Sequence, residues 1–169
     1  MSTHSPLQSY RLISSSPQET ARLAALLGRF LTAGCVVCLA GELGTGKTCL
    51  AQGIARGLGV PEDVYVTSPS FAVINEYLGR LPLFHVDLYR IEDPAELEGI
   101  GFEEIVYGDA VVVIEWADKF VDVLPEERLE IFLSFLDNDS RAITLTPLGP
   151  RARELAEQYL TAAHEPHVA

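Results

Sequence analysis

The stretch "GELGTGKTC", Gly41–Cys49, decides the fold of this chain. It matches the pattern G-x-x-x-x-G-K-[ST], whose glycines permit a compact turn with backbone N–H groups pointing inward, toward a bound anion. The apolar run "CVVCLA" (35–40) before it predicts a buried strand, and residues 47–58 after it predict a helix. A helix that begins at such a turn adds the positive end of its dipole to the anion site. The stretch therefore predicts a P-loop that binds a nucleotide.

Elements on the N-terminal side of the P-loop are predicted from their patterns. "SYRLIS" (9–14) alternates weakly and predicts a first strand. "SPQE" predicts the start of a helix, with Ser16 as the N-cap, Pro17 at the first helical position and Glu19 completing a capping box. Gly34 is expected to end that helix.

Elements on the C-terminal side include two predicted hairpins. The first joins "FAVINEYL" to "LPLFHVDLYR" at Gly79-Arg80, and the second joins "RLEIFLSFL" to "RAITLTPL" at the turn "DNDS". "DPAELEGIGFEEIV" predicts a short helix with a glycine interruption, "AVVVIEW" a buried strand, and residues 150–162 a closing helix.

These elements together predict an α/β protein with the P-loop NTPase fold. Its sheet is expected to be mixed, mostly parallel with antiparallel hairpins, and to carry helices on both faces. We expect one domain over residues 1–169, with a core over about 9–162 and a flexible tail over 163–169.

Charge and composition narrow the function. Acidic residues outnumber basic ones by 24 to 12, which gives a formal net charge of −12. Proteins that hold nucleic acid by themselves normally carry the opposite balance, so we expect contact with tRNA to be indirect and no direct DNA binding. The apolar runs are too short to span a bilayer, and the first residues show no export signal. The expected location is the cytoplasm, without a membrane partner.

The three cysteines predict no metal or redox centre. Cys35 and Cys38 form a C-x-x-C pair, but the pair lies on a predicted strand and no second pair exists to complete a zinc site. Buried core thiols are the favoured interpretation.

Two carboxylates follow apolar strands and are candidates for metal binding and hydrolysis. Asp87 ends "LFHVD" and Glu115 ends "VVVIE". In P-loop proteins such groups hold Mg²⁺ or orient the attacking water. His85 precedes Asp87 by two positions; a metal pair is conceivable, but a packed or hydrogen-bonded histidine is favoured. Trp116 is expected to pack rather than to stack on a base.

The segment "TSPS", Thr67–Ser70, lies between the P-loop helix and the first hairpin. Its hydroxyl groups are suited to sensing a γ-phosphate. An ordinary turn rich in serine and proline is an equally good interpretation of the stretch alone.

Four stretches in the same order carry a resemblance to a known family. They are "GELGTGKT", "VTSPSFAVINEY", "FHVDLYRIEDPAELEGIGFEE" and "VVVIEWAD". Together they resemble the TsaE (YjeE) family, the ATPase of bacterial tRNA threonylcarbamoyladenosine biosynthesis, from about Ser9 to Leu136.

The resemblance implies hydrolysis of ATP with Mg²⁺, weak in the protein alone and stimulated in a complex. It implies that the protein docks on TsaB and TsaD and resets that pair between cycles. The pair modifies the adenosine beside the anticodon in tRNAs that read ANN codons.

The resemblance also assigns roles to residues. Lys47 would bind phosphate, Thr48 and Glu115 would ligate the metal, Asp87 would support hydrolysis, and Ser16-Pro17 would lie near the adenine. The expected nucleotide-contacting residues are Gly41, Glu42, Leu43, Gly44, Thr45, Gly46, Lys47, Thr48, Cys49, Ser16, Pro17, Thr67 and Ser70.

The sequence departs from the family at two positions. Cys49 replaces a hydroxyl residue after the P-loop threonine, and its place at a helix N-terminus suggests the hypothesis of an oxidation-sensitive site. The stretch "SPSF" replaces the more usual "SPTF" and keeps the hydroxyl group.

Two other functions fit a P-loop. A small kinase for a nucleoside or metabolite would need a lid with several arginines, and Arg90 is one candidate for such an arginine. A nucleotide-binding switch without turnover would not need Lys47, Thr48, Asp87 and Glu115 together. A GTPase is disfavoured because the guanine-reading pattern N-K-x-D does not occur.

Overall fold

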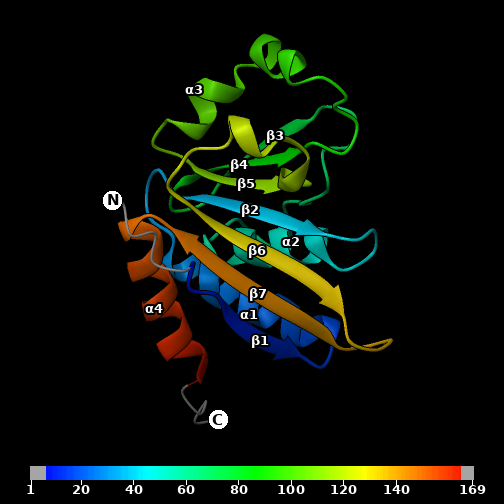
Figure 1. Cartoon of the computed structure of the whole chain (residues 1–169), viewed down its shortest axis with the longest axis vertical. Helices are drawn as coiled ribbons and strands as arrows, with labels where there is room; N and C mark the ends of the chain where they lie inside the picture. The colour runs from blue at the N-terminus through cyan, green and yellow to red at the C-terminus, as the bar shows by residue number, and fades with distance from the viewer. Residues whose placement is uncertain (1–6, 165–169) are drawn as a thin grey trace.

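A single sheet of seven strands forms the centre of the computed structural model, which describes residues 7–164 (Figure 1). The strands lie in the order β1-β7-β6-β2-β5-β4-β3. Their bounds are β1 (Tyr10–Ser14), β2 (Val36–Gly41), β3 (Ile74–Leu78), β4 (Pro82–Asp87), β5 (Val111–Glu115), β6 (Arg128–Phe135) and β7 (Arg141–Leu148).

The sheet is mixed, as predicted. Strand β2 runs parallel to β5 and β6, and β4 runs parallel to β5. The pairs β1–β7, β6–β7 and β3–β4 are antiparallel, and the last two are the predicted hairpins. Only β3 and β7 therefore run against the common direction, so the carboxyl ends of the central strands meet at one edge.

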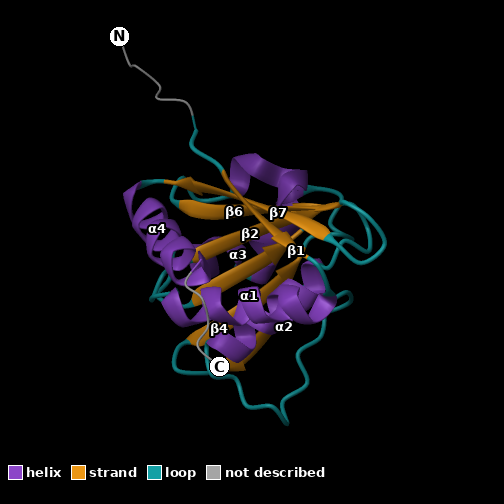
Figure 2. Ribbon diagram, turned by 90° about the horizontal axis from the view of Figure 1, so that it is seen from below, coloured by secondary structure: helices purple, strands orange, loops and turns teal. Residues whose placement is uncertain are grey.

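Helices cover both faces of the sheet. The helices α1 (Pro17–Phe30), α2 (Lys47–Gly57) and α4 (Pro150–His164) pack on one face, and α1 and α2 lie side by side (Figure 2). The short segments η1 (Pro94–Ile100), α3 (Phe102–Val106) and η2 (Ala117–Val123) pack on the other.

Strand β2 shows why two apolar layers form. Successive side chains of a strand point to opposite faces. Val37 and Leu39 accordingly join the layer beneath α1 and α2, whereas Val36 and Cys38 join the layer beneath α3. A strand buried on both faces must be apolar throughout, which explains the run "CVVCLA".

The start of α1 confirms the predicted N-cap. The Ser16 hydroxyl accepts a hydrogen bond from the Glu19 N–H at 3.1 Å. The predicted capping box is wrong in one detail, because the Glu19 carboxylate accepts from the N–H of Ser15, at 2.7 Å, and not from that of Ser16.

The end of α1 differs from the prediction. The helix ends at Phe30, and Gly34 lies in the turn beyond it with a φ of 80°. The Arg80 guanidinium donates to the carbonyls of Gly28, Arg29 and Leu31. Because a side chain from the β3–β4 turn satisfies these carbonyls, the helix ends without a glycine cap.

Other boundaries shift by a few residues. Strand β3 begins at Ile74 because Val73, with a φ of 65°, interrupts the extended backbone. Helix α4 continues to His164, two residues beyond the predicted core, and residues 165–169 of the predicted tail lie outside the described residues. Among residues 7–164, no helix has the length and apolar character needed to cross a membrane.

Candidate nucleotide site

The P-loop connects the carboxyl end of β2 to the first turn of α2. Gly41 ends β2 with a φ of 141°, and a Cβ there would lie 2.4 Å from the Leu133 carbonyl oxygen. Gly46 is the N-cap of α2 with a φ of 107°. Both positions therefore require glycine, one for space and both for backbone conformation.

Lys47 is buried at the mouth of the loop, with 4% of its surface exposed. Its Nζ donates to the carbonyls of Gly41, at 2.7 Å, and Glu42, at 2.8 Å. The same atom lies 3.9 Å from the centroid of the Trp116 ring. The loop thus holds its own cation at the place where phosphate oxygens would meet it.

Burial lowers the pKa of Lys47, and the negative charges of Glu115, Asp118 and Asp87 oppose that shift. A phosphate group beside the amine would add further negative charge and would favour the protonated form. The electrostatics of the loop therefore suit an anion.

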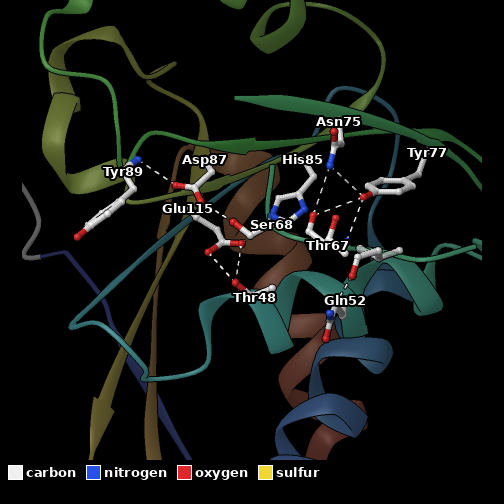
Figure 3. Close-up of polar contacts among 11 residues, drawn as sticks. Thr48, Gln52, Thr67, Ser68, Asn75, Tyr77, His85, Asp87, Tyr89 and Glu115 are labelled. Carbon is white, nitrogen blue, oxygen red and sulfur yellow. Dashed lines mark hydrogen bonds and ion pairs between the residues drawn. The ribbon is translucent and has the colours of Figure 1, made fainter. Parts of the chain in front are cut away.

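Glu115 forms the centre of a buried polar chain (Figure 3). It ends β5 with 2% of its surface exposed. The Thr48 hydroxyl donates to its carboxylate at 3.1 and 3.2 Å, and His85 Nε2 lies 2.7 Å from its Oε1. The favoured interpretation of His85 as a hydrogen-bonded residue is confirmed.

Asp87 lies next to Glu115 because the two strands are in register there. Its Oδ2 accepts a hydrogen bond from the Ser68 hydroxyl at 2.5 Å, and its Oδ1 accepts from the Tyr89 N–H at 2.9 Å (Figure 3). The two strand-end carboxylates thus take part in separate networks.

The backbone of Thr67 is held by strand β3, whereas Ser68 and Ser70 line the cavity beside the P-loop. Its N–H donates to the Tyr77 hydroxyl at 3.2 Å, and that hydroxyl donates to the Thr67 carbonyl at 3.4 Å. Asn75 also donates to the Tyr77 hydroxyl. Strand β3 therefore anchors the start of the segment, and the hydroxyl-bearing residues of the segment that line the cavity are Ser68 and Ser70.

A cavity of about 430 Å³ gathers most of the predicted site. The predicted residues that line it are Leu43, Gly44, Gly46, Lys47, Thr48, Ser70, Asp87 and Glu115. Gly41 and Glu42 take part through the carbonyls that hold Lys47.

Thr48 and Glu115 supply the hard oxygen atoms that Mg²⁺ prefers, and Mg²⁺ usually takes only one or two protein carboxylates beside water and phosphate. In the described part of the chain, no three His, Cys, Asp or Glu residues form a metal cluster.

A smaller cavity, of about 50 Å³, lies on the other side of Gly46. Pro17, Thr45 and Cys49 line it, whereas the Ser16 hydroxyl is engaged in capping α1. Burial raises the pKa of the Cys49 thiol, which works against a reactive thiolate and therefore against the oxidation hypothesis.

Three contributors were missed by sequence reasoning. Arg141, at the start of β7, donates from Nε to the Thr45 carbonyl at 3.1 Å and so supports the P-loop. Lys119 donates to the carbonyls of the loop after Asp87, at 2.7 to 3.1 Å. Trp116 packs, as expected, at 5.0 Å from Tyr89, but its place over the Lys47 amine was not expected. Nothing local in the sequence links these positions to their partners.

The parallel central strands, the P-loop and the adjacent strand-end carboxylates define an α/β protein with the P-loop NTPase fold. The model of the family "Threonylcarbamoyl adenosine biosynthesis protein TsaE" matches residues 14–143. The chain belongs to the TsaE family.

Relatives in several bacteria share most of this length. The tRNA threonylcarbamoyladenosine biosynthesis protein TsaE of Treponema pallidum is 44% identical over 135 residues, which cover 80% of this chain and 98% of that protein. The protein of the same name from Bacillus subtilis is 42% identical over 144 residues, covering 85% and 89%. A crystal structure of YdiB from Bacillus subtilis matches with a TM-score of 0.80 at 35% identity, and covers 93% of this chain and 97% of that one.

Proposed function

We propose that this protein is a Mg²⁺-dependent ATPase that acts on a TsaB–TsaD complex in tRNA threonylcarbamoyladenosine biosynthesis. The observation that carries the proposal is the convergence of Lys47, Thr48, Asp87 and Glu115 on one cavity beside the P-loop. These residues come from α2, β4 and β5, and each supplies a group that phosphoryl chemistry requires.

The P-loop binds the phosphates. Its backbone N–H groups and the first turn of α2 form the anion site, and Lys47 exchanges its carbonyl partners for phosphate oxygens. Thr48 and Glu115 would hold Mg²⁺, which would supply positive charge to neutralise the phosphates. Their existing contact at 3.1 Å places both oxygen donors on the same side of the loop.

Asp87 and the serines beside it complete the hydrolytic end of the site. The Asp87 carboxylate faces the cavity and is fixed by the Ser68 hydroxyl and the Tyr89 N–H. A carboxylate held in this way orients a water molecule and accepts its proton. Ser68 and Ser70 line the same cavity, and their hydroxyl groups would contact the terminal phosphate and sense whether it is present.

The family and the charge support this choice of partner. Relatives of this chain are named for threonylcarbamoyladenosine biosynthesis. With a net charge of −12, a protein partner rather than tRNA itself is the better target for this chain. We infer that the protein docks on TsaB–TsaD and resets the pair after each modification, with hydrolysis stimulated in the complex.

The test measures release of phosphate from ATP with and without Mg²⁺, and with and without the TsaB–TsaD pair of the same organism. The native protein is compared with Glu115→Ala and with Glu157→Ala, a control that removes an exposed glutamate from α4. Stimulation by the pair that persists in the control and disappears in Glu115→Ala is the expected result. Rapid turnover that ignores the pair would refute the proposed role.

The same assay separates the alternatives. A kinase would release little phosphate unless an acceptor were present. Arg90, the candidate arginine for a kinase lid, lines the cavity and stacks on Phe71, with its guanidinium carbon 4.3 Å from the ring centroid. A switch module would bind nucleotide without releasing phosphate even in the presence of the partners.

A further inference from the structure

His85 is a buried polar side chain that has no assigned role in the proposed ATP hydrolysis. It lies in β4 with 1% of its surface exposed. Its Nε2 contacts Glu115 at 2.7 Å, and its Nδ1 has no hydrogen-bond partner among residues 7–164. A buried polar group with an unsatisfied atom is unfavourable for stability. Any role of His85 in the site therefore depends on its hydrogen bond to Glu115.

The direction of that bond follows from the partners of Glu115. The carboxylate already accepts the Thr48 hydroxyl proton on both oxygens, at 3.2 and 3.1 Å. Because a carboxylate oxygen accepts hydrogen bonds, we assign the donor role in this contact to His85 Nε2. His85 thus donates the shorter of the contacts on Glu115.

Strand register explains how the ring reaches the carboxylate. His85 is opposite Val113, and Asp87 is opposite Glu115, so His85 lies one diagonal step from Glu115 on the parallel strand. Diagonal neighbours in a sheet are within reach of an aromatic side chain. Two rigid strands therefore fix the donor, whereas a glutamate side chain by itself has several rotatable bonds.

We propose that His85 is a positioning residue, which holds the Glu115 carboxylate toward Thr48 and thereby sets the Mg²⁺ affinity of the nucleotide site. The inference rests on the proposed function, because it needs Glu115 to be a metal ligand. Partners that hold a metal ligand in place typically change metal affinity by 10- to 100-fold when they are lost. Asp87, two residues away on the same strand, has its own partners and does not share this role.

Two substitutions form a matched pair of equal polarity. His85→Gln places an amide donor near the position of Nε2, where it can reach Glu115. His85→Asn is shorter and places its amide near the position of Nδ1, for which the described part of the chain offers no hydrogen-bond partner. Binding of a non-hydrolysable ATP analogue is measured by calorimetry in EDTA, and then as a function of Mg²⁺ concentration.

We expect His85→Asn to weaken the Mg²⁺ affinity of the nucleotide complex by 10- to 100-fold, and His85→Gln by less than threefold. Affinity for the analogue in EDTA should stay within twofold for both, since the P-loop itself is untouched. Equal Mg²⁺ affinity in the native protein and His85→Asn would overturn the inference. Equal losses of EDTA affinity in both variants would also overturn it, because they indicate a role in folding alone.

A third variant tests the route through Glu115. In a Glu115→Gln background, His85→Asn should cause no further loss of Mg²⁺ affinity, because the ligand that it positions has already been neutralised. Additive losses would show that His85 acts by another path. If the native protein binds the analogue with no dependence on Mg²⁺, the proposed metal site fails, and that result is distinct from a failure of His85.

Discussion

Replacing Gly53 of α2 with alanine is expected to destabilise the protein, although the same change inside an exposed helix is stabilising. Gly53 lies in the interior of α2, which crosses α1. A Cβ at this position would lie 2.5 Å from the Ala24 Cβ and 2.8 Å from the Ala21 carbonyl oxygen, both of α1. Neither atom can rotate away, so the two helices must separate.

Two opposing effects determine how much Gly53→Ala changes the free energy of unfolding. Alanine favours the helical backbone over glycine by about 1 kcal/mol. Forcing an extra methyl group into a close-packed contact costs about 1 to 3 kcal/mol. Because the contacts are with a backbone carbonyl and a Cβ, the upper part of that range applies, which leaves a net loss of about 2 kcal/mol. For a chain of this size, that loss lowers the melting temperature by about 4 to 8 °C.

Thermal and urea unfolding of Gly53→Ala measure the effect. Gly99→Ala is the matched control, because a Cβ at Gly99 meets nothing within 4 Å, and its stability should change by no more than about 0.5 kcal/mol. In the double variant Ala24→Gly/Gly53→Ala, the methyl contact is gone, so the two changes should be less than additive in their cost. A Gly53→Ala protein that melts above the native one would refute the close contact between α1 and α2.

Three further predictions concern other parts of the molecule. Glu127 accepts hydrogen bonds from the N–H groups of Arg151 and Ala152 at the start of α4, so Glu127→Ala should lower stability by about 1 kcal/mol, measured by urea unfolding. Burial raises the pKa of Cys38 from 9.0 to about 12, so the thiol stays neutral in the folded protein while the unfolded chain ionises. The stability that the neutral Cys38 thiol contributes is complete below pH 9 and is lost as pH rises toward 12. The free energy of unfolding should therefore fall less steeply between these pH values in Cys38→Ala than in the native protein, as urea titrations at each pH will show. Trp116, the only tryptophan of the chain, lies over the Lys47 amine, so its fluorescence should change when Mg-ATP draws that amine to phosphate; an unchanged spectrum at saturation would contradict this.

The parts of the fold that the sequence predicts are those set by local chemistry. The strand, turn and helix around Gly41–Cys49 depend on glycine conformation and on an apolar run, both of which are visible in a short window. The hairpin turns and the start of α1 at Ser16 depend on neighbouring residues in the same way. Their boundaries move where a distant side chain intervenes, as when Arg80 satisfies the carbonyls at the end of α1.

The sequence predicts those functional groups of the candidate site that lie at the ends of apolar strands. Asp87 and Glu115 each close an apolar run, and parallel strands bring such ends to one edge. The support of Arg141 for the P-loop was not predictable, because it spans 96 residues and depends on β7 lying beside β6 and β1. Thr67 is predicted to contact the nucleotide together with Ser70, but only Ser70 lines the cavity, and the N–H of Thr67 donates to the Tyr77 hydroxyl.

Asp87 and Glu115 line the same cavity but have different hydrogen-bond partners, and under the proposed function this difference would let one respond to the terminal phosphate while the other holds the metal. Glu115 is fixed from the sheet by His85 and meets Thr48 at the start of α2, so its environment is built from rigid elements. Asp87 is bonded instead to Ser68, which belongs to a segment without regular structure between α2 and β3. A ligand that drew Ser68 toward a phosphate would therefore free an oxygen of Asp87 while leaving Glu115 in place. Metal binding and activation of water would then depend on different parts of the chain, and only the second would change with the state of the nucleotide.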